Sequence, residues 1–171
     1  ALKFSYESGS SRESKIIPCK KALSKMITKL QKYDNSKEYL IQNIKDECVR
    51  QLGALRATEK EIAHMIEIKW LADKDQRSDY ITIEALIKIG TYEATQILSK
   101  RLAYYNNIVK EGGKTAFDKE EGEKLMLEII EGLGYIGDDL ALEELEKIRT
   151  GEEYSNTMRN AAGKSVKKLL E

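Results

Sequence analysis

A single histidine and two cysteines are the side chains of this chain best suited to nucleophilic or metal chemistry. His64 stands between Ala63 and Met65, where we expect an imidazole that is partly buried or lies at the edge of the core. A catalytic histidine needs a nucleophile and an orienting carboxylate beside it, and a zinc site here would need carboxylate ligands as well. No motif in the sequence supplies either set. It therefore predicts no catalytic residue, no cofactor and no metal site.

The two cysteines are nearly equidistant from a turn expected at Asp34-Asn35. Cys19 lies 15 residues before Asp34, and Cys48 lies 14 residues after it. Equal distance from the turn of an antiparallel helix pair means equal height, and both cysteines lie on apolar stripes, so they should approach each other. A disulfide needs Cα atoms within about 7 Å, whereas packed helix axes are about 8–10 Å apart. We therefore expect two reduced core cysteines; the alternative, a disulfide, would imply an oxidising compartment.

Gly113-Lys114-Thr115 has the form of the end of a phosphate-binding loop. That motif also needs a glycine at position 108, which is Ile108, and a preceding strand, where we expect a helix. The sequence therefore predicts no nucleotide site. The polar segment 110–122, which includes Phe117, is interpreted instead as a loop inserted between two helices. Long loops on rigid scaffolds often bind partners, and a tolerated insertion without a function is the alternative.

Apolar residues at helical spacing predict the elements that would position these side chains. The chain has 171 residues, of which 41% are apolar and 34% charged, as is typical of one globular domain. Successive apolar stripes predict about eight helices, and no run of residues alternates as a half-buried strand does. Residues 1–14 have no periodicity and are expected to form a flexible lead-in. The predicted fold class is all-α, with one domain at 15–171 and Pro18 in the first helical turn.

The predicted helices repeat in pairs. The pattern Leu-x-x-Leu/Ile closes every second helix, clearly at Leu52, Leu86 and Leu133 and more weakly at Val166. These positions are 34, 47 and 33 residues apart, and removal of the 13-residue insertion from the long interval leaves 34. A period of this length is typical of stacked helix pairs, because one pair cannot bury its apolar faces alone.

Two stretches, Glu84–Ala94 and Gly132–Ala141, resemble HEAT-like repeats of the phycocyanobilin-lyase type. In that family a first helix ends in leucine, any two residues, isoleucine and glycine, and a short turn leads to the second helix. The resemblance covers residues 36–171 and is specific around 84–98 and 130–146, whereas residues 45–71 lack the glycine. It implies a right-handed α-solenoid of stacked antiparallel helix pairs whose second helices line the concave side.

Charge is balanced overall but segregated along the chain. The sequence has 29 basic and 29 acidic side chains, yet residues 1–33 have a net charge of +6 and residues 115–153 a net charge of −9. The basic helix expected at 15–33 could contact phosphates, although a sequence pI near 6.9 argues against nucleic acid as the main partner. The acidic segment, with Glu120 and Glu121, could bind a partner that has a basic surface. For both segments an ordinary solvated helix face is the alternative.

Aromatic residues add candidates for a contact surface. Trp70 and Tyr104 are expected in the core, whereas Tyr105, close to Lys100 and Arg101, is expected at the surface as an interface anchor. The predicted partner-binding residues are therefore Lys100, Arg101, Tyr105, Phe117, Glu120 and Glu121.

Together these features predict a non-enzymatic scaffold or adaptor that binds another protein. Two alternatives stay open: a chromophore-lyase-like or other enzyme that uses the concave face, and nucleic-acid binding through the helix at 15–33. No apolar run approaches the roughly 18 residues of a membrane span, and the half-repeats at both ends could pair in a homo-oligomer. The compartment depends on Ala1: cytoplasmic if it follows only a removed methionine, extracytoplasmic or periplasmic if it follows a cleaved signal peptide.

Overall fold

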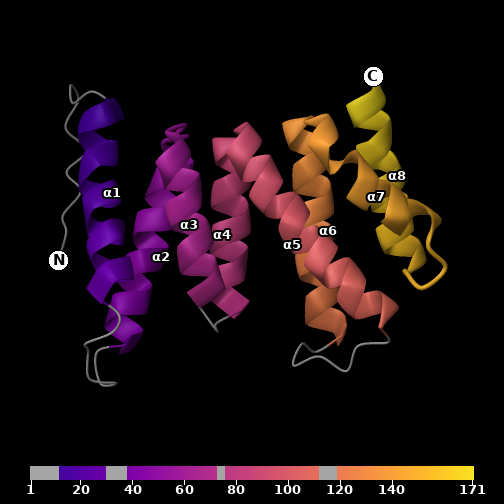
Figure 1. Ribbon diagram of the computed structural model, residues 1–171, viewed down its shortest axis with the longest axis horizontal. Helices are drawn as coiled ribbons and strands as arrows, with labels where there is room; N and C mark the ends of the chain where they lie inside the picture. Colours follow the sequence, from indigo (N-terminus) through magenta and orange to yellow (C-terminus); the bar gives the residue numbers. More distant parts are fainter. Residues whose placement is uncertain (1–11, 30–37, 73–75, 112–118) are drawn as a thin grey trace.

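The computed structural model describes residues 12–29, 38–72, 76–111 and 119–171 (Figure 1). Within these ranges all regular elements are helical and none is a strand, which confirms the prediction of an all-α chain with about eight helices. Within the same ranges no helix combines the length and the apolar character needed to cross a membrane. The helices are α1 (Arg12–Lys29), α2 (Glu38–Ala54), α3 (Lys60–Ala72), α4 (Gln76–Ile89), α5 (Tyr92–Lys110), α6 (Lys119–Ile136), α7 (Leu142–Thr150) and α8 (Asn156–Leu170), and a short 3-10 turn, η2 (Asp139–Ala141), precedes α7.

Two helices begin earlier than the sequence indicates. α1 begins at Arg12, so Pro18 lies inside the helix and not in its first turn. Pro18 is exposed, and the carbonyl group that its ring leaves without an N–H partner can therefore meet water. α6 begins at Lys119, inside the expected loop 110–122. Residues 1–11 and 112–118, and with them Phe117 and Gly113-Lys114-Thr115, lie outside the described residues.

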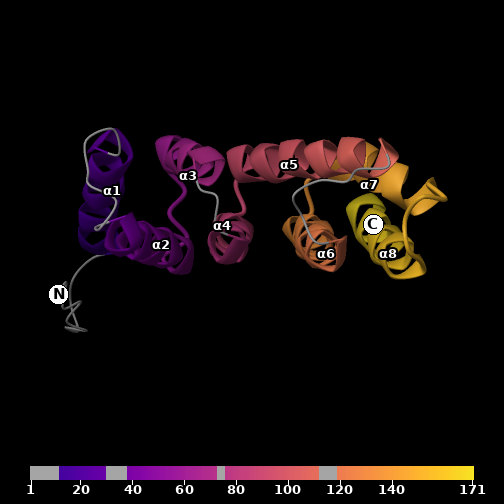
Figure 2. The same ribbon diagram turned by 90° about the horizontal axis from the view of Figure 1, so that it is seen from below.

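The helices form two layers along the long axis of the molecule (Figure 2). In one layer α2, α4, α6 and α8 follow one another, and each helix contacts the next. In the other layer α3, α5 and α7 do the same. α1 packs on both α2 and α3 at one end, and α8 lies at the opposite end. From α2 to α8 the chain therefore changes layer at every connection between helices.

The repeated Leu-x-x-Leu/Ile pattern supplies core residues to the layer of even-numbered helices. Leu52 of α2, Leu86 of α4 and Leu133 of α6 are fully buried, and Val166 of α8 is buried at the corresponding position. Burial of a side chain of this size contributes about 1.5–3 kcal/mol to folding. The spacing of these residues in the sequence thus corresponds to one buried anchor in every second helix.

Glycine allows the even-numbered helices to approach closely. A Cβ atom at Gly53 of α2 would lie 2.6 Å from the Cα atom of Ala85 in α4. A Cβ atom at Gly134 of α6 would lie 2.3 Å from Oγ of Ser165 in α8, which donates a 2.9 Å hydrogen bond to the carbonyl of Ile130. Side chains cannot occupy such short distances, so the helices contact each other through backbone at these glycines.

Two further glycines end helices. Gly90 after α4 and Gly137 after α6 have φ angles of 60° and 81°, a left-handed conformation that other residues rarely adopt. A capping residue follows each of them. The side chain of Thr91 accepts a 3.3 Å hydrogen bond from the backbone N–H of Ala94 in α5, and Asp138 caps η2 in the same way. The glycine and the capping residue after it thus end one helix and begin the next, between α4 and α5 and between α6 and η2.

The last helix presents a polar side to solvent. Asn160, Lys164 and Lys168 of α8 are exposed, whereas Val166 faces the core. A polar outer face is typical of the terminal unit of a stacked repeat protein. Leu170, which is exposed at the end of α8, is the large apolar side chain left at this end of the described chain. Association of two copies through their ends stays a prediction.

Candidate interaction surface

The outer side of α3 exposes apolar side chains to solvent. Ile66 and Trp70 point into the core, whereas Ile68 and Leu71 are exposed and Met65 is half-buried. Residues three apart on a helix are neighbours on its surface, so Met65, Ile68 and Leu71 form a row along α3. Exposed apolar side chains on the solvent side of a helix, here next to the polar Lys60, Glu61 and His64, offer a surface that another molecule can cover.

Arg101 of α5 joins α5 to the last turn of α3. Its Cζ atom lies 5.0 Å from the centre of the Trp70 ring and 5.1 Å from the centres of the Tyr104 and Tyr105 rings. Its Nε atom donates a 3.2 Å hydrogen bond to Oη of Tyr105, and Nε1 of Trp70 donates a 2.5 Å bond to Asp79 of α4. A cation–π contact contributes about 0.5–2 kcal/mol. These contacts hold α3 against α5 and fix Tyr104 beside the end of α3.

Three large apolar side chains are therefore exposed on two neighbouring helices, α3 and α5. Ile68 and Leu71 come from α3, and Tyr104 comes from α5, where its ring contacts the same guanidinium group as the last turn of α3. We call Ile68, Leu71 and Tyr104 the apolar patch. Lys100 and Arg101 border it on α5. An exposed apolar cluster with a charged border is typical of a protein contact site.

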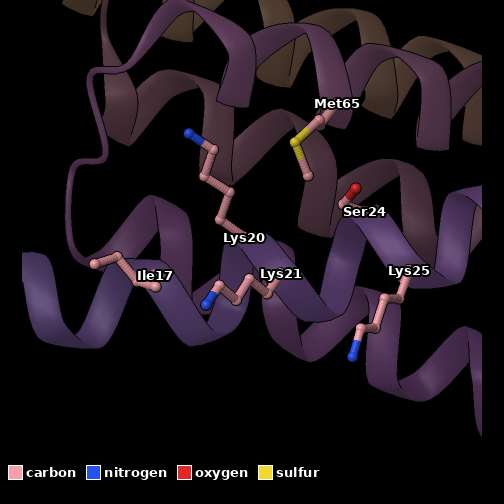
Figure 3. A pocket seen from close by; sticks show the side chains of 6 residues that line it. All are labelled: Ile17, Lys20, Lys21, Ser24, Lys25 and Met65. Carbon is pink, nitrogen blue, oxygen red and sulfur yellow. The ribbon is translucent and has the colours of Figure 1, made fainter.

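A groove between α1 and α3 continues this surface (Figure 3). Its volume is about 650 Å³. In Figure 3 Lys20 reaches toward α3 and Met65 points down from α3 toward α1, whereas Lys25 points away from α3. Because Met65 precedes Ile68 by about one helical turn, the groove and the apolar patch adjoin each other along α3. We call it the lysine groove, and its lining residues are Ile17, Lys20, Lys21, Ser24, Lys25 and Met65.

Ion pairs link α3 to α5 on the same face. Nζ of Lys60 lies 3.6 Å from Oε1 of Glu93, and Nζ of Lys100 lies 4.0 Å from Oε1 of Glu67. The other carboxylate oxygen of Glu67 lies 3.2 Å from Nδ1 of His64. Exposed pairs of this kind contribute about 0–1 kcal/mol each.

The structure places two of the predicted partner-binding residues beside the apolar patch. Lys100 is exposed and Arg101 is half-buried on the side of α5 that faces α3. Tyr105, however, is only 3% exposed, so the expectation that it is the surface tyrosine is wrong. The surface tyrosine is Tyr104, at 50% exposed. Adjacent residues on a helix point about 100° apart, and α5 packs its Tyr105 side into the core.

The other predicted partner-binding residues lie elsewhere. Glu120 and Glu121 begin α6, in the opposite layer from α5. Nζ of Lys124 donates a 2.9 Å hydrogen bond to Glu120. Glu121 lies near Tyr80 of α4, whose pKa is raised first by burial and then by the charge of Glu121. The structure therefore does not bring these carboxylates to the surface that Lys100 and Arg101 share, and Phe117 falls outside the described residues.

The reactive side chains do not assemble into a catalytic group. Cys19 and Cys48 are both buried and free, and burial raises the pKa of the Cys48 thiol to about 11, with smaller contributions from Cys19 and Glu47. His64 is exposed, so the expectation that it is partly buried is wrong; it lies on the solvent side of α3, one turn before Ile68. The imidazole thus faces solvent while the thiols face the interior. Among the residues that the structure describes, no group of three His, Cys, Asp or Glu side chains could hold a metal ion.

The sequence patterns described above do not identify three exposed apolar residues of this surface, Ile17, Ile68 and Leu71. A helical projection of residues 60–72 would have placed Ile68 and Leu71 opposite the buried stripe of Ile62 and Ile66, which is the signal that could have found them. Ile17 joins them only through the packing of α1 on α3, which no local pattern encodes.

Comparison with protein-family models, with curated proteins and with solved structures gave no match for this chain. The geometry of the outer face of α1, α3 and α5 is therefore the basis on which we assign a function.

Proposed function

We propose that this chain is a non-enzymatic scaffold that binds another protein through the outer face of α1, α3 and α5. The observation behind the proposal is the apolar patch. Ile68, Leu71 and Tyr104 expose large apolar side chains on neighbouring helices, and each Å² of apolar area that a partner removes from water contributes about 25 cal/mol. Arg101 holds Tyr104 in place before any partner arrives, which lowers the entropic cost of binding.

The proposal includes the HEAT-like fold, a short right-handed α-solenoid of helix pairs. It is supported by the contacts between successive helices within each layer and by the burial of Leu52, Leu86 and Leu133 at repeating positions. In such a stack the second helix of each pair lines the concave side, and α3 and α5 would be second helices. A concave surface on a rigid stack is the usual binding site of repeat proteins.

The non-enzymatic part of the proposal is supported by the positions of the reactive groups. The thiols of Cys19 and Cys48 lie in the core, where a substrate has no access, and the imidazole of His64 faces solvent next to Glu67. An enzyme would need a nucleophile and a base within hydrogen-bond distance of each other and of a bound substrate.

The apolar patch can be tested with two substitutions, Leu71→Asp and Tyr104→Ala. Proteins that the wild-type chain enriches from an extract of its source cells are identified, the partner is purified, and its Kd is measured by isothermal titration calorimetry. We expect each substitution to weaken binding by about tenfold or more, because interface anchors of this size cost over 1.4 kcal/mol when removed.

Matched control variants are Leu170→Asp in α8 and Tyr135→Ala in α6. Leu170 is 69% exposed and Leu71 is 72% exposed, and Tyr135 at 70% is at least as exposed as Tyr104. The controls should leave the Kd within about twofold of wild type, a difference of under 0.5 kcal/mol. Equal losses in patch and control variants, or no loss in either, would show that the patch does not bind the partner.

A further inference from the structure

We infer that the lysine groove receives an acidic amphipathic segment of the partner protein. Carboxylates of that segment would meet Lys20 inside the groove and Lys21 and Lys25 along its α1 edge, and its apolar side chains would cover Ile17 and Met65. The inference rests on the proposed function, since it specifies the chemistry of the partner that binds the same outer face. The two can still be tested separately, because the groove and the apolar patch have no residue in common.

The two walls of the groove have different characters. On α1, Ile17, Lys21 and Lys25 follow one another at intervals of four residues and so form a row that is apolar at one end and basic along the rest. On α3, the row that begins at Met65 and continues through Ile68 is apolar. A helix laid between these walls needs acidic residues on the side that faces α1 and apolar residues on the side that faces α3. Amphipathic helices bind grooves in this way, with anchor residues spaced by three or four positions along one side of the helix.

The chain itself already places one carboxylate against the groove. Glu61, in the first turn of α3, pairs with Nζ of Lys20, and this pairing lowers the pKa of Glu61. The contact shows that a carboxylate approaching from the side of α3 reaches the ammonium group of Lys20. Lys21 and Lys25 follow Lys20 by one and five residues along α1, and both line the groove. A partner with carboxylates spaced by a helical turn would therefore extend a row that Glu61 begins.

Nucleic acid fits the same groove less well. Its phosphates would need a continuous basic track, but Glu61 already pairs with Lys20, and Ile17 and Met65 form apolar parts of the wall. The chain as a whole also has a formal net charge of zero. Carboxylates interspersed with apolar side chains match this mixture of charge and apolar surface better than a uniform polyanion does.

The test uses the full chain and a defined probe. The probe is a fluorescein-labelled synthetic peptide of roughly 15 residues, about 22 Å long as a helix, with Glu on one side and Leu on the other. A second peptide has Lys at every Glu position, and a labelled single-stranded DNA of similar length is the third probe. Fluorescence anisotropy at several salt concentrations reports each affinity. We expect the acidic peptide alone to bind, with an affinity that falls as salt rises.

Two double variants with the same change in net charge locate the binding. Lys21→Glu/Lys25→Glu changes the groove, and Lys164→Glu/Lys168→Glu changes exposed lysines of α8 at the other end of the molecule. All four side chains are exposed, so both variants should fold, and circular dichroism checks this. The groove variant should bind the acidic peptide with an affinity about tenfold or more lower than that of wild type. The α8 variant should lose less than about twofold in affinity, since charge effects are screened beyond about 10 Å.

Each other result would overturn the inference in a distinct way. Equal weakening by the two double variants means that general charge attraction explains the binding. Binding of DNA that exceeds binding of the acidic peptide and is lost in the groove variant means that the groove is a nucleic-acid site. Self-association of the chain that the groove variant abolishes, measured by analytical ultracentrifugation, assigns the groove to a second copy. If the purified partner still depends on Leu71 and Tyr104 but not on Lys21 and Lys25, the inference fails and the proposed function stands.

Discussion

Nζ of Lys69 lies 2.6 Å from Oδ1 of Asp46, in the interior where α2, α3 and α4 meet. The side chain of Lys69 is fully buried, and that of Asp46 is 9% exposed. Ser78 of α4 donates a 3.0 Å hydrogen bond to the same oxygen, and Gln42 donates another at 3.3 Å. Removing two charges from water costs several kcal/mol, which only close contact and added hydrogen bonds offset. The pair therefore specifies how three helices meet more than it adds to stability.

Replacing Lys69 with methionine should destabilise the fold strongly. Methionine has a similar length and no charge, so it leaves the Asp46 carboxylate buried without its ammonium partner. Breaking a buried ion pair from one side costs about 3–5 kcal/mol. Urea denaturation followed by circular dichroism should show a loss of this size in the free energy of unfolding for Lys69→Met.

The double variant Lys69→Met/Asp46→Asn should recover part of this loss, because neither buried charge then remains. Lys60→Met is the surface control, since the pair of Lys60 with Glu93 spans 3.6 Å and the Lys60 side chain is 72% exposed. We expect the control to change stability by less than about 1 kcal/mol. If Lys69→Met behaves like Lys60→Met, the buried pair does not determine the packing of these helices.

Glycine at the crossing of α2 and α4 gives a second prediction. Gly53→Ala would place a Cβ atom 2.6 Å from backbone of Ala85, which cannot move aside as a flexible side chain can. We expect a loss of about 1–3 kcal/mol, the usual cost of overpacking a core, measured by thermal and urea denaturation.

Gly163→Ala in α8 is the matched control. A Cβ atom there meets only the side chain of Arg149, at 3.8 Å, which is an ordinary contact. Alanine is favoured over glycine inside a helix by about 0.5–1 kcal/mol, so this substitution should stabilise the protein. Destabilisation by both substitutions to a similar extent would mean that close approach at Gly53 is not the cause.

The number and the type of the elements could be predicted from the sequence because they depend on local information. Apolar residues at helical spacing, the glycines that follow α4 and α6, and the buried leucines Leu52, Leu86 and Leu133 all lie in short stretches of chain. The start of α1 is less predictable, because a proline is typical of a first turn, whereas the exposed position of Pro18 permits it inside the helix.

The candidate surface could be predicted only in part. Lys100 and Arg101 were assigned to it from their neighbours, but the choice of Tyr105 over Tyr104 was wrong, because which side of α5 is covered depends on α3 and the other helices packed on it. The lysines of α1 were recognised as a basic helix, whereas their place opposite Met65 follows from the packing of α1 on α3. The burial of Lys69 could not be predicted from the sequence, because lysine side chains are rarely buried.

Alkaline pH should destabilise the protein through Cys48. The pKa of this thiol is raised from 9.0 to about 11 in the folded chain, chiefly by burial. Between these two values the unfolded chain releases the proton and the folded chain keeps it, so the stabilising contribution is complete below pH 9 and is lost as the pH rises toward 11. From pH 8 to pH 10 we expect a loss of about 1 kcal/mol from this group, at roughly 1.4 kcal/mol per pKa unit. Tyr154, whose pKa burial raises to about 12, adds a similar loss only above pH 10.

Comparison with Cys48→Ala isolates the thiol. The substitution lowers stability at every pH because it leaves a small cavity, but its free energy of unfolding should fall less steeply than that of wild type between pH 8 and pH 10. Urea denaturation at intervals of half a pH unit measures both curves. Parallel curves would mean that the Cys48 thiol ionises equally in the folded and unfolded chain, and hence that it is not buried as its 3% exposure indicates.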